Sequence, residues 1–257
     1  YSYSYIVFGE IIAWLVGWSL LLEYGLATAA VATGWSGYFI SLLEGLNIHI
    51  PLALTGPFNL EEGTYINLPA ICIIFVIGIL LTLGMKESAR FNALLVAIKV
   101  GVILLFIAVG VFYVKPENWT PFLPFGMSGV FTGAALVFFA YLGFDAVSSA
   151  AEEVKNPQRS MPIGIIGSLF ICTLLYVVVS LVLTGIVPYT NLNVTDPVSF
   201  AMQVINQEWA AGIISLGAVI GMMTVILVMM YGGTRLLMAF ARDGLMPKIF
   251  SQLSPKR

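Results

Sequence analysis

The sequence predicts an all-α membrane protein that crosses a bilayer six times. Of its 257 residues, 60% are hydrophobic and only 9% are charged, whereas soluble domains have roughly 45–50% apolar and about 25% charged residues. The mean hydropathy is +0.99. The apolar runs are too long for strands and lack alternation with period two, so we do not expect a β-barrel. The composition excludes an ordinary cytosolic enzyme and a disordered chain, and the net charge of −2 offers no basic surface for nucleic acid.

Six apolar segments are about as long as the ~20 residues that a membrane helix needs. They run over about 5–38, 66–84, 91–114, 127–151, 162–187 and 209–240. The first and the last are long enough to cross with tilt or to project beyond one face. Because no soluble domain separates these segments, we interpret 1–257 as one transmembrane domain.

Basic residues divide the connecting segments into two sets. Nine of the eleven lie in one set, at Lys86, Arg90, Lys155, Arg159, Arg235, Arg242, Lys248, Lys256 and Arg257. The positive-inside rule places these segments and the C-terminal end in the cytoplasm. The segments 40–65, 115–126 and 188–208 then face outward; they contain Lys115 and six acidic residues, at Glu44, Glu61, Glu62, Glu117, Asp196 and Glu208.

One outer segment contains an amphipathic stretch from Val198 to Ile205. Two interpretations remain open: a short helix over an external vestibule, or a surface loop with one helical turn. Cys72 and Cys172 lie in apolar runs and are expected to pack as small hydrophobic residues. His49 lies alone in a loop, so we expect no metal site and no cofactor. Since the sequence also lacks a Ser–His pair and paired carboxylates in one helix, we expect no enzyme.

Three ionisable residues fall within predicted membrane helices. A charge at bilayer depth costs roughly 2.5–3.5 kcal/mol on insertion scales, so such residues usually face a cavity or a partner. Glu23 is either a functional group within the membrane or a structural residue near the outer interface. Lys99 has apolar or small neighbours on its helix, which favours an inward-facing ammonium that acts as a fixed cation or exchanges a proton.

The third ionisable residue, Asp145, follows Gly143 in the middle of the fourth segment. Glycine lowers helix stability by up to ~1 kcal/mol, and an aspartate can cap a new helix that starts after it. The pair suggests a helix that is broken within 127–151, whose free carbonyl and amide groups would bind a small zwitterion beside a cavity. The alternative is a continuous helix with glycine at a packing contact.

Several motifs resemble amino acid permeases of the amino acid–polyamine–organocation superfamily. They are FFAYLGFDAVSSAAEEVKNPQRSMPIGI (138–165), SARFNALLVAIKVGVILLF (88–106), VKPENWTPFLPFG (114–126) and TRLLMAFARDGLMPK (234–248). They are most similar to the cationic-amino-acid-transporter subgroup, especially its bacterial proton-coupled members. The resemblance covers nearly the whole chain and implies helices three to eight of a five-plus-five inverted-repeat fold, so we expect a fragment of a longer protein.

The resemblance also implies roles for individual residues. Backbone carbonyls at Phe139, Ala140 and Leu142 would hold the substrate α-amine, and the Phe139 ring would cover the bound amino acid. Met229 would line the side-chain pocket and help to exclude large cationic side chains.

Three further residues match the family's polar network. Lys99 corresponds to a lysine that replaces a sodium ion and is linked to proton coupling, and Asp145 and Glu23 correspond to acidic residues near the site.

The expected function is therefore uptake of neutral or small L-amino acids by a proton-coupled secondary transporter that works by alternating access in the plasma membrane. The expected partners are the amino acid, protons, the lipid bilayer and the remaining helices of the parent chain. Three alternatives stay open: a sodium-independent exchanger, a cationic amino acid permease and a membrane amino acid sensor that does not transport.

Overall fold

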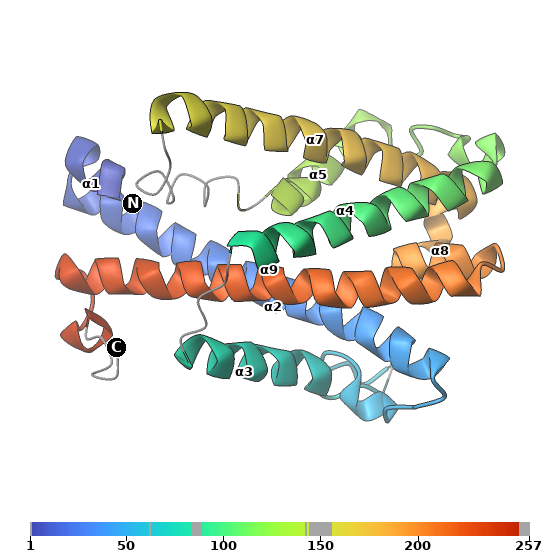
Figure 1. Ribbon diagram of the computed structural model, residues 1–257, viewed down its shortest axis with the longest axis horizontal. Helices are drawn as coiled ribbons and strands as arrows, with labels where there is room; N and C mark the ends of the chain where they lie inside the picture. Colours follow the sequence, from blue (N-terminus) through green and yellow to red (C-terminus); the bar gives the residue numbers. More distant parts are fainter. Residues whose placement is uncertain (1, 62, 84–88, 142, 144–155, 252–257) are drawn as a thin grey trace. The chain divides into compact units, whose positions relative to one another are not determined.

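The computed structural model describes residues 2–61, 63–83, 89–141, 143 and 156–251, and these residues form helices and turns (Figure 1). The α-helices are α1 (Ser2–Phe8), α2 (Glu10–Gly45), α3 (Leu68–Thr82), α4 (Ala89–Gly110), α5 (Gly126–Val137), α7 (Pro157–Ile186), α8 (Pro197–Val204) and α9 (Glu208–Arg242). The 3₁₀ helices are η1 (Leu52–Leu54), η2 (Val111–Tyr113), η3 (Pro116–Trp119), η4 (Phe138–Tyr141), η6 (Tyr189–Asn191) and η7 (Lys248–Ser251). The all-α prediction is confirmed.

Within the described residues, four helical stretches are long and apolar enough to cross a bilayer. They are Glu10–Gly45, Ala93–Tyr113, Gln158–Ile186 and Glu208–Arg242. The apolar helix α3 has 15 residues, a rise of about 22 Å, and Gly126–Tyr141 is also shorter than the four. Because the hydrocarbon core is about 30 Å thick, six complete crossings stay a prediction.

The first predicted segment, 5–38, is divided and extended in the structure. Gly9 has φ +80° and separates α1 from α2. At the other end, α2 continues through Gly45 and ends where Asn47 takes a left-handed conformation with φ +60°. There the Ile48 N–H donates to the Leu43 carbonyl at 2.9 Å, which is the Schellman pattern of a helix C-terminus.

The position of Glu44 is therefore corrected. We expected it in an outer loop, but it lies in the last turn of α2, where its carbonyl accepts a 2.9 Å hydrogen bond from the Asn47 N–H. The physical reason is that asparagine adopts the left-handed conformation at low cost. The apolar pattern of α2 therefore continues until Asn47 ends it.

The amphipathic stretch from Val198 to Ile205 forms a helix over most of its length, as one of the two interpretations proposed. This helix, α8, has Pro197 in its first turn and follows Asp196. It ends in a second left-handed asparagine, Asn206, with φ +59°, and the Gln207 N–H donates to the Met202 carbonyl at 2.9 Å. The same capping geometry thus ends both α2 and α8.

The chain divides into two compact units. Unit 1 comprises Tyr1–Ser36, Ile50–Glu87 and Gly221–Arg257. In this unit, the early part of α2 packs closely on the late part of α9, because Gly17 leaves room for the ring of Phe240: a Cβ at Gly17 would lie only 1.6 Å from the ring. The Ser36 hydroxyl donates to the side-chain oxygen of Asn67 at 2.6 Å, and Asn67 caps α3.

Unit 2 comprises Gly37–His49 and Ser88–Ile220, and it contains a hydrophobic core. The helices α4 and α7 pack together (Figure 1) and α8 packs on both. The core residues are Phe106, Val182, Ile186, Val187, Ala201, Met202, Ala210, Ala211 and Ile214. The turn at η3 is fastened to the end of α7, since the Asn118 amide donates to the Gly185 carbonyl at 2.7 Å. This core holds α8 in place.

A glycine contact between α9 and α4 predicts a stability difference. A Cβ at Gly217 would lie 2.5 Å from Val102, a β-branched residue that cannot move aside easily, whereas a Cβ at Gly212 meets nothing within 4 Å. Overpacking costs about 1–3 kcal/mol, against a gain of up to ~1 kcal/mol in helix propensity for either Gly→Ala change. We expect Gly217→Ala to melt at a lower temperature than Gly212→Ala in thermal scans of the purified protein. Equal melting temperatures would contradict this packing.

Candidate functional site

The backbone leaves α-helical geometry in the middle of the fourth predicted segment. The helix α5 ends at Val137, and the next four residues form the tighter 3₁₀ helix η4. Gly143 then has φ +106°, a conformation that side-chain-bearing residues rarely adopt. A change from i→i+4 to i→i+3 pairing leaves carbonyl groups of the last α-helical turn without their usual partners. The segment therefore presents backbone acceptors that other groups must bind.

One such acceptor is bound by a side chain from α7. The Tyr176 hydroxyl donates to the Ala140 carbonyl at 2.8 Å. The neighbouring Tyr141 hydroxyl donates to Thr173 Oγ1 at 3.0 Å, and the Tyr141 and Tyr176 rings meet edge to face with centroids 5.3 Å apart. Two hydroxyl contacts and one ring contact thus fasten η4 to one face of α7.

This arrangement leaves Ala140 able to bind a second donor. A carbonyl oxygen has two lone pairs, and the hydroxyl of Tyr176 occupies one of them. Ala140 is exposed, and the Phe139 ring beside it is 41% exposed. Such a carbonyl can accept a hydrogen bond from an ammonium group. The accessible aromatic ring beside it can pack against an apolar side chain.

Phe139 and Ala140 lie in η4, and Gly143 follows it in sequence, all in unit 2. Lys99 belongs to the same unit; it is half-buried in α4 and interacts with another group. The predicted site residues Leu142 and Asp145 lie outside the described residues.

The other two predicted site residues belong to unit 1. Glu23 is half-buried in α2 and interacts with another group. Met229 is buried in α9. In the same unit, the ring of Tyr24 lies within ordinary contact distance of a Cβ at Gly232. Their convergence on the η4 carbonyls stays a prediction.

The sequence reasoning missed Tyr176 and Thr173, which hold η4 in place. Both lie in α7, one turn apart, in a run that is otherwise apolar. Residues three apart lie on the same helix face, so a hydroxyl pair at this spacing in a membrane helix was the available signal. It indicates a hydrogen-bonding face, although it cannot identify the partner.

Comparisons with known proteins identify the family of the chain. The family model described as amino acid permease matches residues 1–257. The chain is 58% identical over 255 residues to the methylthioribose transporter of Bacillus subtilis (strain 168), covering 99% of this chain and 55% of the relative. It is 54% identical to the branched-chain amino acid permease BcaP of the same organism, covering 100% of this chain and 56% of the relative.

A plant relative is more distant. The chain is 41% identical to cationic amino acid transporter 9, chloroplastic, of Arabidopsis thaliana, covering 99% of this chain and 46% of that protein. The chain therefore spans about half the length of the curated relatives that it matches.

The contact between α7 and η4 predicts an effect on local opening. Tyr176→Phe removes the hydroxyl but keeps the ring that packs on Tyr141. A hydrogen bond contributes about 1 kcal/mol, so amide hydrogen exchange in 138–143 should become roughly fivefold faster. Tyr113→Phe is the matched control, because its hydroxyl is bonded to Gln207 instead. Unchanged exchange in Tyr176→Phe would show that this hydroxyl does not hold η4.

Proposed function

Because the chain belongs to the amino acid permease family, we propose that it forms part of a secondary active transporter that takes up neutral or small L-amino acids together with protons. The transporter alternates between outward-facing and inward-facing states. The relatives are named as transporters or permeases. Membership of the permease family, together with the long apolar helices, indicates a multi-pass membrane protein. Substrate, coupling ion and orientation are the parts that we propose here.

The observation that carries the proposal is the change from α-helix to 3₁₀ helix at η4, followed by the positive φ of Gly143. Ala140 is exposed, its carbonyl oxygen accepts the Tyr176 hydroxyl with one of its two lone pairs, and the Phe139 ring beside it is accessible. An α-ammonium group has three donors and matches backbone acceptors, and broken helices in transporters bind small zwitterions in this way. In this proposal the carbonyls of Phe139, Ala140 and Leu142 hold the ammonium, and Gly143 permits the break.

Lys99 supports coupling to protons rather than to sodium. Its ammonium in α4 would repel a sodium ion at close range, whereas a lysine that changes its surroundings during the cycle can release and recover a proton. In this proposal, Glu23 and Asp145 complete the polar network, and Met229 limits the size of the substrate side chain.

The proposed topology follows from the basic residues. The segments with most of the lysines and arginines, including the C-terminal end after Arg242, face the cytoplasm. The segment with α8 then faces outward, and the protein resides in the plasma membrane.

A second candidate substrate comes from one relative. The relative that is 58% identical over 255 residues is named a methylthioribose transporter, and a neutral thioether sugar lacks the α-ammonium that the η4 carbonyls would bind. The other relatives are named for branched-chain and cationic amino acids. These names make the substrate the first question for experiment. Two further questions are whether the protein exchanges substrates instead of importing them with protons, and whether it senses amino acids without transporting them.

The function can be tested with the full-length transporter in proteoliposomes. We predict that this chain is a part of that transporter. Uptake of radiolabelled leucine, alanine, arginine and methylthioribose is measured with and without an inward proton gradient. We expect leucine or alanine to accumulate only with the gradient. Uptake that is independent of the proton gradient would overturn proton coupling. Uptake of methylthioribose without uptake of leucine or alanine would overturn the proposed substrate class. Substrate binding without flux would identify a sensor.

The role of Lys99 predicts a separable defect. Lys99→Ala removes the proposed proton carrier, so gradient-driven accumulation should fall to the level of vesicles without protein. Substrate binding, measured as ligand-induced thermal stabilisation, should persist, because the η4 carbonyls remain. Lys115→Ala removes an exposed lysine outside the predicted helices and should leave accumulation unchanged. Normal accumulation in Lys99→Ala would make this lysine structural.

A further inference from the structure

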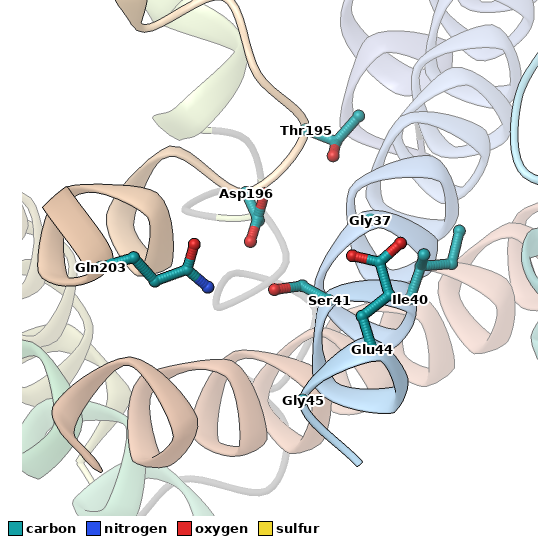
Figure 2. A pocket seen from close by; sticks show the side chains of 8 residues that line it. All are labelled: Gly37, Ile40, Ser41, Glu44, Gly45, Thr195, Asp196 and Gln203. Atoms are coloured by element: carbon teal, nitrogen blue, oxygen red, sulfur yellow. The ribbon is translucent and has the colours of Figure 1, made fainter. Parts of the chain in front are cut away.

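A pocket of about 410 Å³ lies in unit 2, between the end of α2 and the segment that leads into α8. Figure 2 shows the Asp196 carboxyl group, the Ser41 hydroxyl and the Gln203 amide pointing into the same space. The pocket is lined by Gly37, Ile40, Ser41, Glu44, Gly45, Thr195, Asp196 and Gln203. It is separate from η4 and has no part in the proposed transport reaction.

The two walls of the pocket touch directly. A Cβ at Gly37 would lie 2.7 Å from Thr195 Cβ and 3.1 Å from the Thr195 carbonyl oxygen. The Ser41 side chain lies close enough to the Asp196 carboxyl group to lower its pKa. One helix turn away, the Tyr38 side chain is half-buried beside Val198. The segment before α8 therefore packs directly on α2 where Gly37 meets Thr195.

The other side of α8 is fixed independently of this contact. The Ser215 hydroxyl of α9 donates to the Ser199 hydroxyl at 2.9 Å, and both side chains are buried. Ala201 and Met202 belong to the hydrophobic core of the unit. Because α8 is held on this side, a change at the pocket affects the segment around 192–196 rather than the whole helix.

The charges around this contact all have the same sign. Among the described residues that line the pocket, Asp196 and Glu44 are the charged ones, and Glu208 lines the adjoining pocket, which shares Ser41 and Gln203. Burial raises the pKa of the Asp196 carboxyl group, and the Glu44 carboxylate raises it further, while the nearby Ser41 side chain acts in the opposite direction. No lysine, arginine or histidine lines either pocket within the described part of the chain.

We propose that Asp196 makes a proton-dependent contact: when its carboxyl group is protonated, the segment before α8 stays on the end of α2, and when Asp196 and Glu44 are both ionised, the segment separates from α2. Protonation removes the like-charge repulsion and leaves a neutral group that fits a partly buried site. With the proposed topology, this contact senses the external pH.

The sign of the pH dependence follows from the direction of the pKa shift. A carboxyl group whose pKa is raised in the contact binds its proton more tightly there than when the segment is free. The contact is therefore strongest below the ordinary aspartate pKa of about 3.9, and it weakens as the pH rises through the raised pKa of Asp196.

A spin label on the segment tests the proposal in the full-length transporter. Val194 is exposed, so Val194→Cys with a nitroxide label, in a background where Cys72 and Cys172 are serine, reports the mobility of the segment. Electron paramagnetic resonance spectra are recorded from pH 4 to pH 8. We expect a restricted label at low pH and a mobile fraction that grows several-fold as the pH rises.

Two variants and one control make the test specific. In Asp196→Asn the mobile fraction should stay low at every pH, and this change removes no helix cap, because the Asp196 side chain makes no capping hydrogen bond. Glu44→Gln should reduce the pH-dependent change, and Glu117→Gln, outside the pocket, should retain all of it. A pH-independent spectrum in the unmodified protein, or the same pH-dependent change in Asp196→Asn, would overturn the proposal.

The spectra do not depend on transport. If the labelled protein shows no uptake but its mobility changes as expected, the proposed function fails and the proton-dependent contact stands. If uptake is driven by the proton gradient but mobility is constant, the reverse holds.

Discussion

The change from α-helix to 3₁₀ helix at η4 depends on the hydrogen bonding of backbone carbonyl groups. A helix that crosses a membrane satisfies its own peptide groups, so an interruption persists only where other donors reach the freed acceptors. Here Tyr176 supplies one donor to the Ala140 carbonyl, and Tyr141 anchors the same turn through Thr173. The remaining acceptor capacity is what the proposed substrate would use. The Ala140 carbonyl would therefore serve twice: it accepts the Tyr176 hydroxyl that holds η4, and it would accept the substrate ammonium.

The helices were largely predictable from the sequence because the relevant signal is local. Long apolar runs specify membrane helices by composition alone, and α4, α7 and α9 overlap the segments predicted at 91–114, 162–187 and 209–240. Helix ends were less predictable. The end of α2 is fixed by Asn47 in a left-handed conformation, which a hydropathy pattern does not detect. Glu44 consequently lies on a helix and lines a pocket, although its segment was interpreted as a loop.

The candidate site was predictable only in part, for a related reason. Gly143 indicated where the helix departs from regular geometry, since glycine in a helix interior is costly and tolerates φ +106°. The partner of the freed carbonyl could not be predicted, because Tyr176 lies 36 residues from Ala140 in the sequence. A hydroxyl in an apolar helix indicates that a partner exists, but folding decides which one. The roles of Met229 and Glu23 came from family resemblance and not from periodicity.

A structure of the full-length transporter with a bound amino acid, determined by electron cryo-microscopy, tests the central claim most directly. We predict that the substrate ammonium lies within hydrogen-bonding distance of the carbonyl oxygens of Phe139 and Ala140, with the Tyr176 hydroxyl still donating to Ala140. A substrate bound elsewhere, beside an α-helix that runs without interruption through residues 138–145, would contradict it.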